Sequence, residues 1–173
     1  PFDLSAYEEK SYDIEYYSTD KVGNNESVKS TLVYLDMNAS NSFLVFTAPY
    51  NNGTMDFVTN GTVFTVSAND AGSGVALRAY RIDDGVWESF TGAFNLSGYL
   101  EGLHTIYFNS TDNVGNVEAI NSTEVYLDDT NPITTLSFVS DFTPDYVNGS
   151  TLFTLTATDS PGSGNFTTAY KVD

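Results

Sequence analysis

Internal repetition constrains this chain more than any single motif does. Residues 2–36 align without a gap with residues 94–128 at an offset of 92, and 19 of the 35 aligned positions are identical. Residues 60–83 align in the same way with residues 148–173, at an offset that drifts from 88 to 90. A period of about 90 residues is the length of one small β-sandwich, so the chain holds slightly less than two periods.

The phase of the repeat predicts one whole unit between two incomplete ones. We expect residues 1–36 to be the back part of a unit, residues 37–128 a complete unit, and residues 129–173 the front part of a third. The two junctions, residues 36–40 and 128–132, are short and contain no glycine. Neighbouring units should therefore be stiffly coupled rather than joined by a flexible tether.

The composition favours strands and turns over helices. Ser, Thr and Asn make up 55 of the 173 residues, and no window longer than ten residues carries a helical apolar stripe. Asp83-Asp84-Gly85 is a hairpin signal, because glycine tolerates the positive φ of such turns. In the whole unit the pattern predicts about seven strands, near residues 43–48, 62–68, 76–82, 86–90, 94–96, 104–110 and 119–127. Short strands at this spacing predict an all-β protein of tandem immunoglobulin-like β-sandwiches.

Several segments of the whole unit also resemble a known group. The segments are YRIDDGVW (80–87), EGLHTI (101–106), DNVGN (112–116) and VYLD (125–128), followed by Pro132. They are similar to the Ig-like OmpL47-type repeats of large bacterial and archaeal surface proteins. The resemblance recurs in both partial units, although EKSY replaces EGLH in the first. It implies an Ig-like fold and a surface location, and it implies no catalytic residue, because that family has none in common.

Catalytic chemistry is not indicated. The only histidine, His104, has Tyr12 as its counterpart, so we expect a histidine on a strand surface rather than a catalytic base. No Gly-x-Ser-x-Gly elbow is present, and the adjacent carboxylate pairs fall in predicted turns or junctions. The absence of cysteine excludes disulfides and thiolate zinc sites. We predict a protein that is not an enzyme.

Acidic turns recur at matching places in the repeat. The pattern DxxGN starts at Asp20 and again at Asp112, and an Asp-to-Gly-Ser-Gly loop starts at Asp70 and at Asp159. In an Ig-like sandwich these loops share one pole with the incoming chain. We therefore expect three carboxylates at each of two junctions, Asp36, Asp70 and Asp112 at one and Asp128, Asp129 and Asp159 at the other. Such oxygen ligands suit Ca²⁺, but turn chemistry alone also explains each loop, and both interpretations stay open.

Glycosylation sequons are more frequent than composition requires. Nine Asn-x-Ser/Thr sequons are present where the Ser and Thr content gives roughly four by chance, at Asn25, Asn38, Asn52, Asn60, Asn95, Asn109, Asn121, Asn148 and Asn165. We predict N-linked glycans, first at Asn25, Asn60 and Asn109, with a compositional accident as the alternative. Dense sequons without cysteine favour an archaeal cell surface over a eukaryotic secreted protein.

The charge restricts the partners. A net charge of −17 argues against nucleic acid and against an anionic membrane surface, and no apolar run is long enough for a membrane span. We predict an extracellular structural repeat of a surface layer, sheath, filament or stalk, assembling head-to-tail with copies of itself. One alternative is an adhesin or carbohydrate-binding module, which needs Tyr16, Tyr17, Trp87 and Tyr107 on one exposed face. The other is an accessory domain of a large secreted hydrolase.

The incomplete units are predicted to be complementary. We expect the last three strands of a unit in residues 1–36 and the first three in residues 133–173, with nine residues of the period represented in neither. Half a sandwich leaves an apolar face in water, so the tail of one copy should complete the head of another. The chain begins at Pro1 with neither Met nor a signal peptide, and we expect it to be a piece of a longer protein. A polymer of subunits and a window on one long chain both fit.

Overall fold

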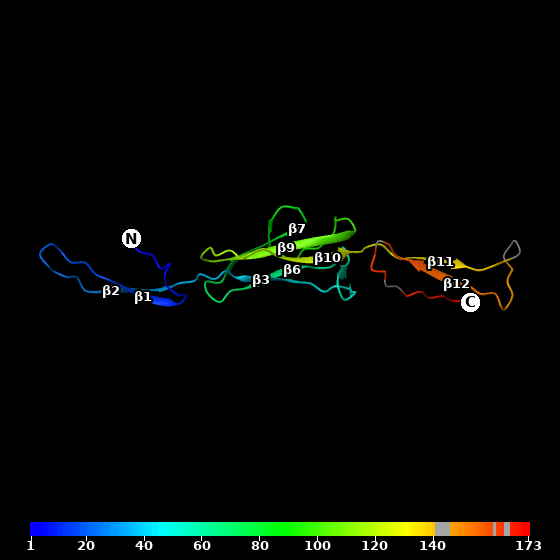
Figure 1. Cartoon of the computed structure of the whole chain (residues 1–173), viewed down its shortest axis with the longest axis horizontal. Helices are drawn as coiled ribbons and strands as arrows, with labels where there is room; N and C mark the ends of the chain where they lie inside the picture. The colour runs from blue at the N-terminus through cyan, green and yellow to red at the C-terminus, as the bar shows by residue number, and fades with distance from the viewer. Residues whose placement is uncertain (141–145, 161, 165–166) are drawn as a thin grey trace.

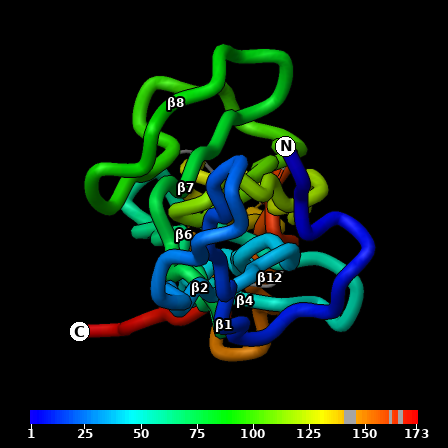
Figure 2. Tube along the Cα trace, turned by 90° about the vertical axis from the view of Figure 1, so that its left-hand side faces the viewer, coloured from blue at the N-terminus to red at the C-terminus, as the bar shows by residue number. Residues whose placement is uncertain are grey.

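The computed structural model describes residues 1–140, 146–160, 162–164 and 167–173, and these residues form strands and loops without a helix. No described segment therefore forms a helix long and apolar enough to cross a membrane. Figure 1 shows an elongated molecule in which an N-terminal hairpin, a central body and a C-terminal hairpin follow one another in line. Along the long axis, the loop that carries β8 projects away from the other strands (Figure 2). The prediction of an all-β protein with several sheets is confirmed.

The central body, within residues 37–128, has two sheets. The larger sheet has the order β4-β5-β10-β9-β7-β8 and the smaller sheet the order β3-β6. All pairings are antiparallel except that of β5 with β10. The strands are β3 (Asn41–Val45), β4 (Tyr50–Asn51), β5 (Asp56–Val58), β6 (Thr65–Asn69), β7 (Val75–Ile82), β8 (Glu88–Ser89), β9 (Gly102–Asp112) and β10 (Asn121–Leu127).

Strict alternation along the strands builds the core between these sheets. On β9, the side chains of Ile106 and Phe108 are buried while those of Thr105 and Tyr107 remain partly exposed, as their spacing predicted. Phe64 and Phe94 exchange two backbone hydrogen bonds, N to O distances 2.8 and 3.1 Å, which extends the smaller sheet. The core consists of Val58, Phe64, Ile82, Leu96, Ile106, Val125 and Leu127. Each such side chain contributes about 1.5–3 kcal/mol by leaving water.

A buried carboxylate network connects the two sheets. Glu118 accepts hydrogen bonds from the amide of Ser42 on β3 at 2.9 Å and from the amide of Ser110 on β9 at 3.1 Å. Asn121 donates to the same carboxylate at 2.8 Å. Burial by itself raises the pKa of Glu118, but these hydrogen bonds outweigh it and hold the pKa below the ordinary 4.5. The carboxylate is therefore a charged link between strands that are far apart in the sequence.

Some strand boundaries differ from the predicted ones. The short strands β4 and β5 were not predicted, because their pairing with β10 depends on tertiary contacts rather than on local alternation. The predicted strand at 94–96 is a single bridge at Phe94. In the predicted hairpin turn, the residue with positive φ is Asp83, at 51°, and not Gly85. Asp83 tolerates this conformation because its carboxylate is held by Thr105 and His104.

His104 is buried, so the prediction of a strand-surface histidine is wrong. Its Nδ1 lies 2.7 Å from the Asp83 carboxylate and its Nε2 lies 2.7 Å from the carbonyl oxygen of Leu100. Its ring also packs edge-on against Tyr99. The ring thus fills a polar corner of the core, which explains why a tyrosine can replace it in the neighbouring repeat.

The incomplete units contribute one hairpin each. In the first, β1 (Ser11–Tyr16) pairs with β2 (Lys29–Tyr34), and these are the counterparts of β9 and β10. In the last, β11 (Ile133–Ser137) pairs with β12 (Thr154–Thr158), the counterparts of β3 and β6. Each was predicted to hold three strands, and the described residues form two. Residues 171–173 have no strand of the β9 type beside them and form no strand.

Candidate metal centre at the junctions between units

The first junction brings Asp36, Asp70 and Asp112 together, as their places in the repeat predicted. One carboxylate oxygen from each lies within 4.8 Å of the others. Asp36 ends the first unit, Asp70 follows β6, and Asp112 ends β9. Three carboxylates at this spacing repel one another unless donors or a cation balance their charge.

Asp112 is buried and is held by its own loop. Its Oδ1 accepts the amides of Val114, Gly115 and Asn116 at 3.0, 2.7 and 2.8 Å, and its Oδ2 accepts the Asn116 side chain at 2.7 Å. Burial by itself raises the pKa of Asp112, but these hydrogen bonds outweigh it, so the net pKa is lowered from 3.8. The group is therefore ionised at neutral pH.

Asp36 and Asp70 are held by the loop after β6. The amide of Ser73 donates to Asp36 at 2.5 Å, and the amide of Gly74 donates to Asp70 at 2.5 Å. A Cβ at Gly72 would overlap the Asp36 carboxyl group, so this close approach across the junction requires glycine. The amides offset part of the negative charge, and Oδ1 of Asp70 keeps free lone pairs for a cation.

The second junction repeats part of this arrangement. Asp128 accepts the amide of Ser163 at 2.6 Å, the counterpart of the contact between Asp36 and Ser73. Oδ1 of Asp128 and Oδ1 of Asp159 are buried without a hydrogen-bond partner. Asp129 points elsewhere, because its carboxylate accepts the Asn60 side chain at 2.5 Å. Of the three carboxylates predicted here, the structure thus holds two at the same loop and pairs the third with Asn60.

A second set of contacts is also repeated at both junctions. The carboxylate of Glu9 accepts the amide of Met37 at 3.3 Å and the side chain of Asn38 at 2.5 Å. The carboxylate of Glu101, 92 residues further along, accepts the amide of Asp129 at 2.9 Å and the hydroxyl of Thr130. Sequence analysis did not select Glu9 or Glu101. Their shared position in the repeat, next to a junction, was the available signal.

The sequons divide by what their amide nitrogens do. N-linked glycosylation needs an accessible Nδ2. In Asn38, Asn60 and Asn121 this nitrogen donates to Glu9, Asp129 and Glu118. Asn109 is half-buried on β9, and Asn165 lies outside the described residues. The exposed sequons in which no hydrogen bond engages Nδ2, among the described residues, are Asn25, Asn52, Asn95 and Asn148.

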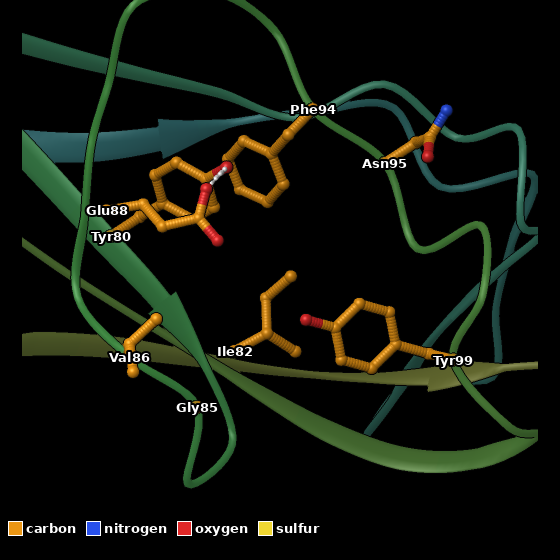
Figure 3. A pocket seen from close by; sticks show the side chains of 8 residues that line it. All are labelled: Tyr80, Ile82, Gly85, Val86, Glu88, Phe94, Asn95 and Tyr99. Atoms are coloured by element: carbon orange, nitrogen blue, oxygen red, sulfur yellow. Dashed lines mark hydrogen bonds between the residues drawn. The ribbon is translucent and has the colours of Figure 1, made fainter.

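A pocket of about 340 Å³ opens beside β7 and β8 in the whole unit. Figure 3 shows the Tyr99 hydroxyl directed into it towards Ile82, and the Tyr80 hydroxyl bonded to Glu88 at 3.1 Å. Burial, and for Tyr80 the Glu88 carboxylate, raise the pKa of both tyrosines, so their hydroxyls stay protonated. The pocket therefore presents aromatic faces and hydrogen-bonding hydroxyls.

The aromatic residues considered for sugar stacking are arranged differently. The guanidinium of Arg81 lies 5.6 Å from the ring centroid of Trp87 and 4.2 Å from that of Tyr107. Both rings thus make cation–π contacts with Arg81. Tyr16 and Tyr17 lie in the first hairpin, away from this pair.

No known protein family, curated protein or solved structure matches this chain.

Proposed function

We propose that the chain is a non-enzymatic structural repeat of an extracellular surface layer, sheath, filament or stalk protein. One observation carries the proposal: the same contacts between successive units occur at both junctions, from Asp36 and Asp128 and from Glu9 and Glu101. Repeated contacts impose the same step from one unit to the next, which is what a linear spacer requires. The acidity keeps such an array soluble and favours a cation-rich exterior.

The units are immunoglobulin-like sandwiches in this proposal. The support is the strand order, in which β3 and β6 form one layer and β5, β10, β9 and β7 the other. The parallel pairing of an early strand with the last strand, β5 with β10, also fits that topology. The similarity to surface repeats of the OmpL47 type belongs to the same proposal and supports an extracellular location.

Stiffness at the junction tests this function. The chain has no cysteine, so two spin labels can be attached at V22C in the first unit and V86C in the second, both highly exposed positions. We expect a narrow distance distribution between the labels. Glu9→Ala removes two junction bonds and should broaden it, whereas Glu8→Ala, whose side chain makes no junction contact, should not. A broad distribution in the unsubstituted chain would contradict the spacer function.

Calcium at the first junction is part of the proposal. Its support is the cluster of Asp36, Asp70 and Asp112 and the unengaged oxygen of Asp70. Millimolar Ca²⁺ should raise the melting temperature followed by Trp87 fluorescence, and EDTA should reverse the shift. Asp70→Asn should abolish the response, while Asp84→Asn, which removes the same charge from an exposed turn, should retain it. No shift in the unsubstituted chain would leave turn chemistry as the sole role of these residues.

Glycans at the exposed sequons would shield the faces of the array. The geometry supports Asn25, Asn52, Asn95 and Asn148 before the others, because their amide nitrogens are exposed and unengaged. Peptide mapping by mass spectrometry of native material tests this ranking. Unmodified peptides at all four positions would contradict it.

Carbohydrate binding is a second candidate, favoured by the pocket beside β8. Its tyrosine rings and the Glu88 carboxylate are groups that commonly contact sugars. Titration calorimetry against neutral oligosaccharides, with Tyr99→Ala as the pocket variant and Tyr17→Ala as the control, tests it. Binding that Tyr99→Ala leaves unchanged would exclude this pocket as the site.

A further inference from the structure

Both incomplete units expose apolar side chains whose counterparts in the whole unit form the core. Phe2 is 76 % exposed, Phe153 53 % and Tyr170 83 %. Their counterparts Phe94, Phe64 and Tyr80 lie in or against the core cluster. Exposed patches of this kind mark surfaces that are covered by a partner.

The two exposed surfaces are complementary halves of one unit. The N-terminal half, residues 1–36, supplies counterparts of β9, β10 and the segment around Phe94. The C-terminal half, residues 133–173, supplies counterparts of β3, β6 and the end of β7. The only stretch of the whole unit without a counterpart, residues 84–92, is the loop around β8, which contributes no residue to the core. The two halves lie at opposite ends of the molecule and so cannot meet within it (Figure 1).

We infer that the C-terminal half of one copy and the N-terminal half of a second copy associate head-to-tail into one complete two-sheet unit. The inference deepens the proposed structural function and rests on it. The partner is a second copy of this chain, because the whole unit between the two halves shows how their counterparts pack.

The whole unit sets the register of the association through its aromatic residues. There, the ring of Phe94 stacks on Phe64 at 5.5 Å and on Tyr80 at 3.9 Å between centroids. In the composite unit, Phe2 of one copy takes this place between Phe153 and Tyr170 of the other. Part of the cluster is already assembled, since Phe138 and Phe153 lie 5.0 Å apart, as do Phe46 and Phe64.

Polar groups on the two halves also match. Glu26 is the counterpart of Glu118 and already accepts Lys29, as Glu118 accepts Asn121. It lacks the donor that β3 gives to Glu118, and Thr134 on β11 is the counterpart of that donor, Ser42. Glu26 of one copy therefore fits Thr134 of the other.

A pair of opposite charges lies in the same register. Arg81 on β7 stands opposite Tyr107 on β9. The counterparts are Lys171 and Glu15, which would face each other across the new strand pair. In the single chain, Lys171 contacts only the nearby carboxylate of Asp173.

The turn after β1 is already shaped for the junction. Asp20 accepts the amide and side chain of Asn24 at 2.9 and 2.8 Å, as Asp112 accepts those of Asn116. In the whole unit, the side chain of Asn116 also donates to the preceding junction at 3.2 Å. Asn24 can give the same bond to the carbonyl oxygen of Asp128 in the other copy. The halves are preorganised, which lowers the entropy lost on association.

Sedimentation of the chain between about 1 µM and 1 mM tests the association. We expect species that grow with concentration without a fixed end point, because a head-to-tail contact does not close. Phe2→Asp should weaken association by about 100-fold, as expected for a central aromatic residue. Val22→Asp adds the same charge at an equally exposed place whose counterpart Val114 stays exposed, and should change association less than about twofold. A chain that stays monomeric throughout, or equal effects of the two variants, would overturn the inference.

Disulfide formation tests the register. Residues directly opposite on paired strands have Cα atoms about 5 Å apart, within disulfide reach. Mixing the E15C and K171C proteins should give a disulfide-linked heterodimer. S30C lies one strand further away, at roughly 10 Å, and should not couple to K171C. Equal coupling to both would overturn the inferred register. A monomeric chain that still gives the narrow spin-label distribution would remove this inference and leave the spacer function intact.

Discussion

Phe64→Ala should strongly destabilise the whole unit, and Phe153→Ala should not, although the two residues occupy the same place in the repeat. Phe64 has no exposed surface and packs against Phe46 and Phe94 at 5.0 and 5.5 Å between ring centroids. Removing such a ring costs about 3–5 kcal/mol through lost transfer energy and the remaining cavity. A unit of this size has a free energy of unfolding of about 5–14 kcal/mol, so the variant loses a large part of it.

The single tryptophan makes this comparison specific. Trp87 lies in the whole unit, so its fluorescence reports the unfolding of that unit and not of the hairpins. Measured at concentrations too low for association, Phe64→Ala should lower the melting temperature by more than about 12 °C. Phe153→Ala lies in another unit and should change the Trp87 transition by less than about 0.5 kcal/mol. Equal effects, or a loss below about 1 kcal/mol for Phe64→Ala, would refute the assignment of the core.

Three further predictions follow from the polar contacts. Because the folded pKa of Glu118 is lowered from 4.5, its contribution is present above that pH and is lost as the pH falls through the folded value, so Glu118→Gln should flatten the acid limb of urea unfolding measured against pH. Gly72→Ala should destabilise the first junction by about 1–3 kcal/mol in thermal melts of the tandem units, whereas Gly61→Ala, which meets only a contact at 3.9 Å, should cost less than about 0.5 kcal/mol. Asp83→Ala should cost about 2–4 kcal/mol in urea unfolding, because it frees the buried His104 and adds strain at positive φ, and Asp83→Asn should cost clearly less.

Sequence reasoning succeeded where the signal was periodic. The repeat gave the unit boundaries and the three carboxylates at the first junction, because equal places in a repeat fold to equal places in space. The alternation of Ile106 and Phe108 gave the buried face of β9. These features depend on local pattern and on topology, which the chain carries in readable form.

The failures share a different physical cause. The burial of His104 depends on Asp83 and Leu100, which reach it through tertiary folding. The pairing of β5 with β10 and the contact of Asp129 with Asn60 likewise join segments far apart in sequence. No local propensity encodes such contacts, so a single sequence without an alignment does not reveal them.

The parallel pairing of β5 with β10 determines how a unit responds to tension. Val125, Tyr126 and Leu127 stand opposite Asp56, Phe57 and Val58. If a strand near the start of the unit and the strand at its end are pulled in opposite directions, parallel neighbours slide along each other. Their hydrogen bonds are then loaded in shear and must break together, not one after another as in a hairpin that is peeled open. A surface stalk made of such units would resist drag with a force set by this short pair of strands, and would yield one unit at a time.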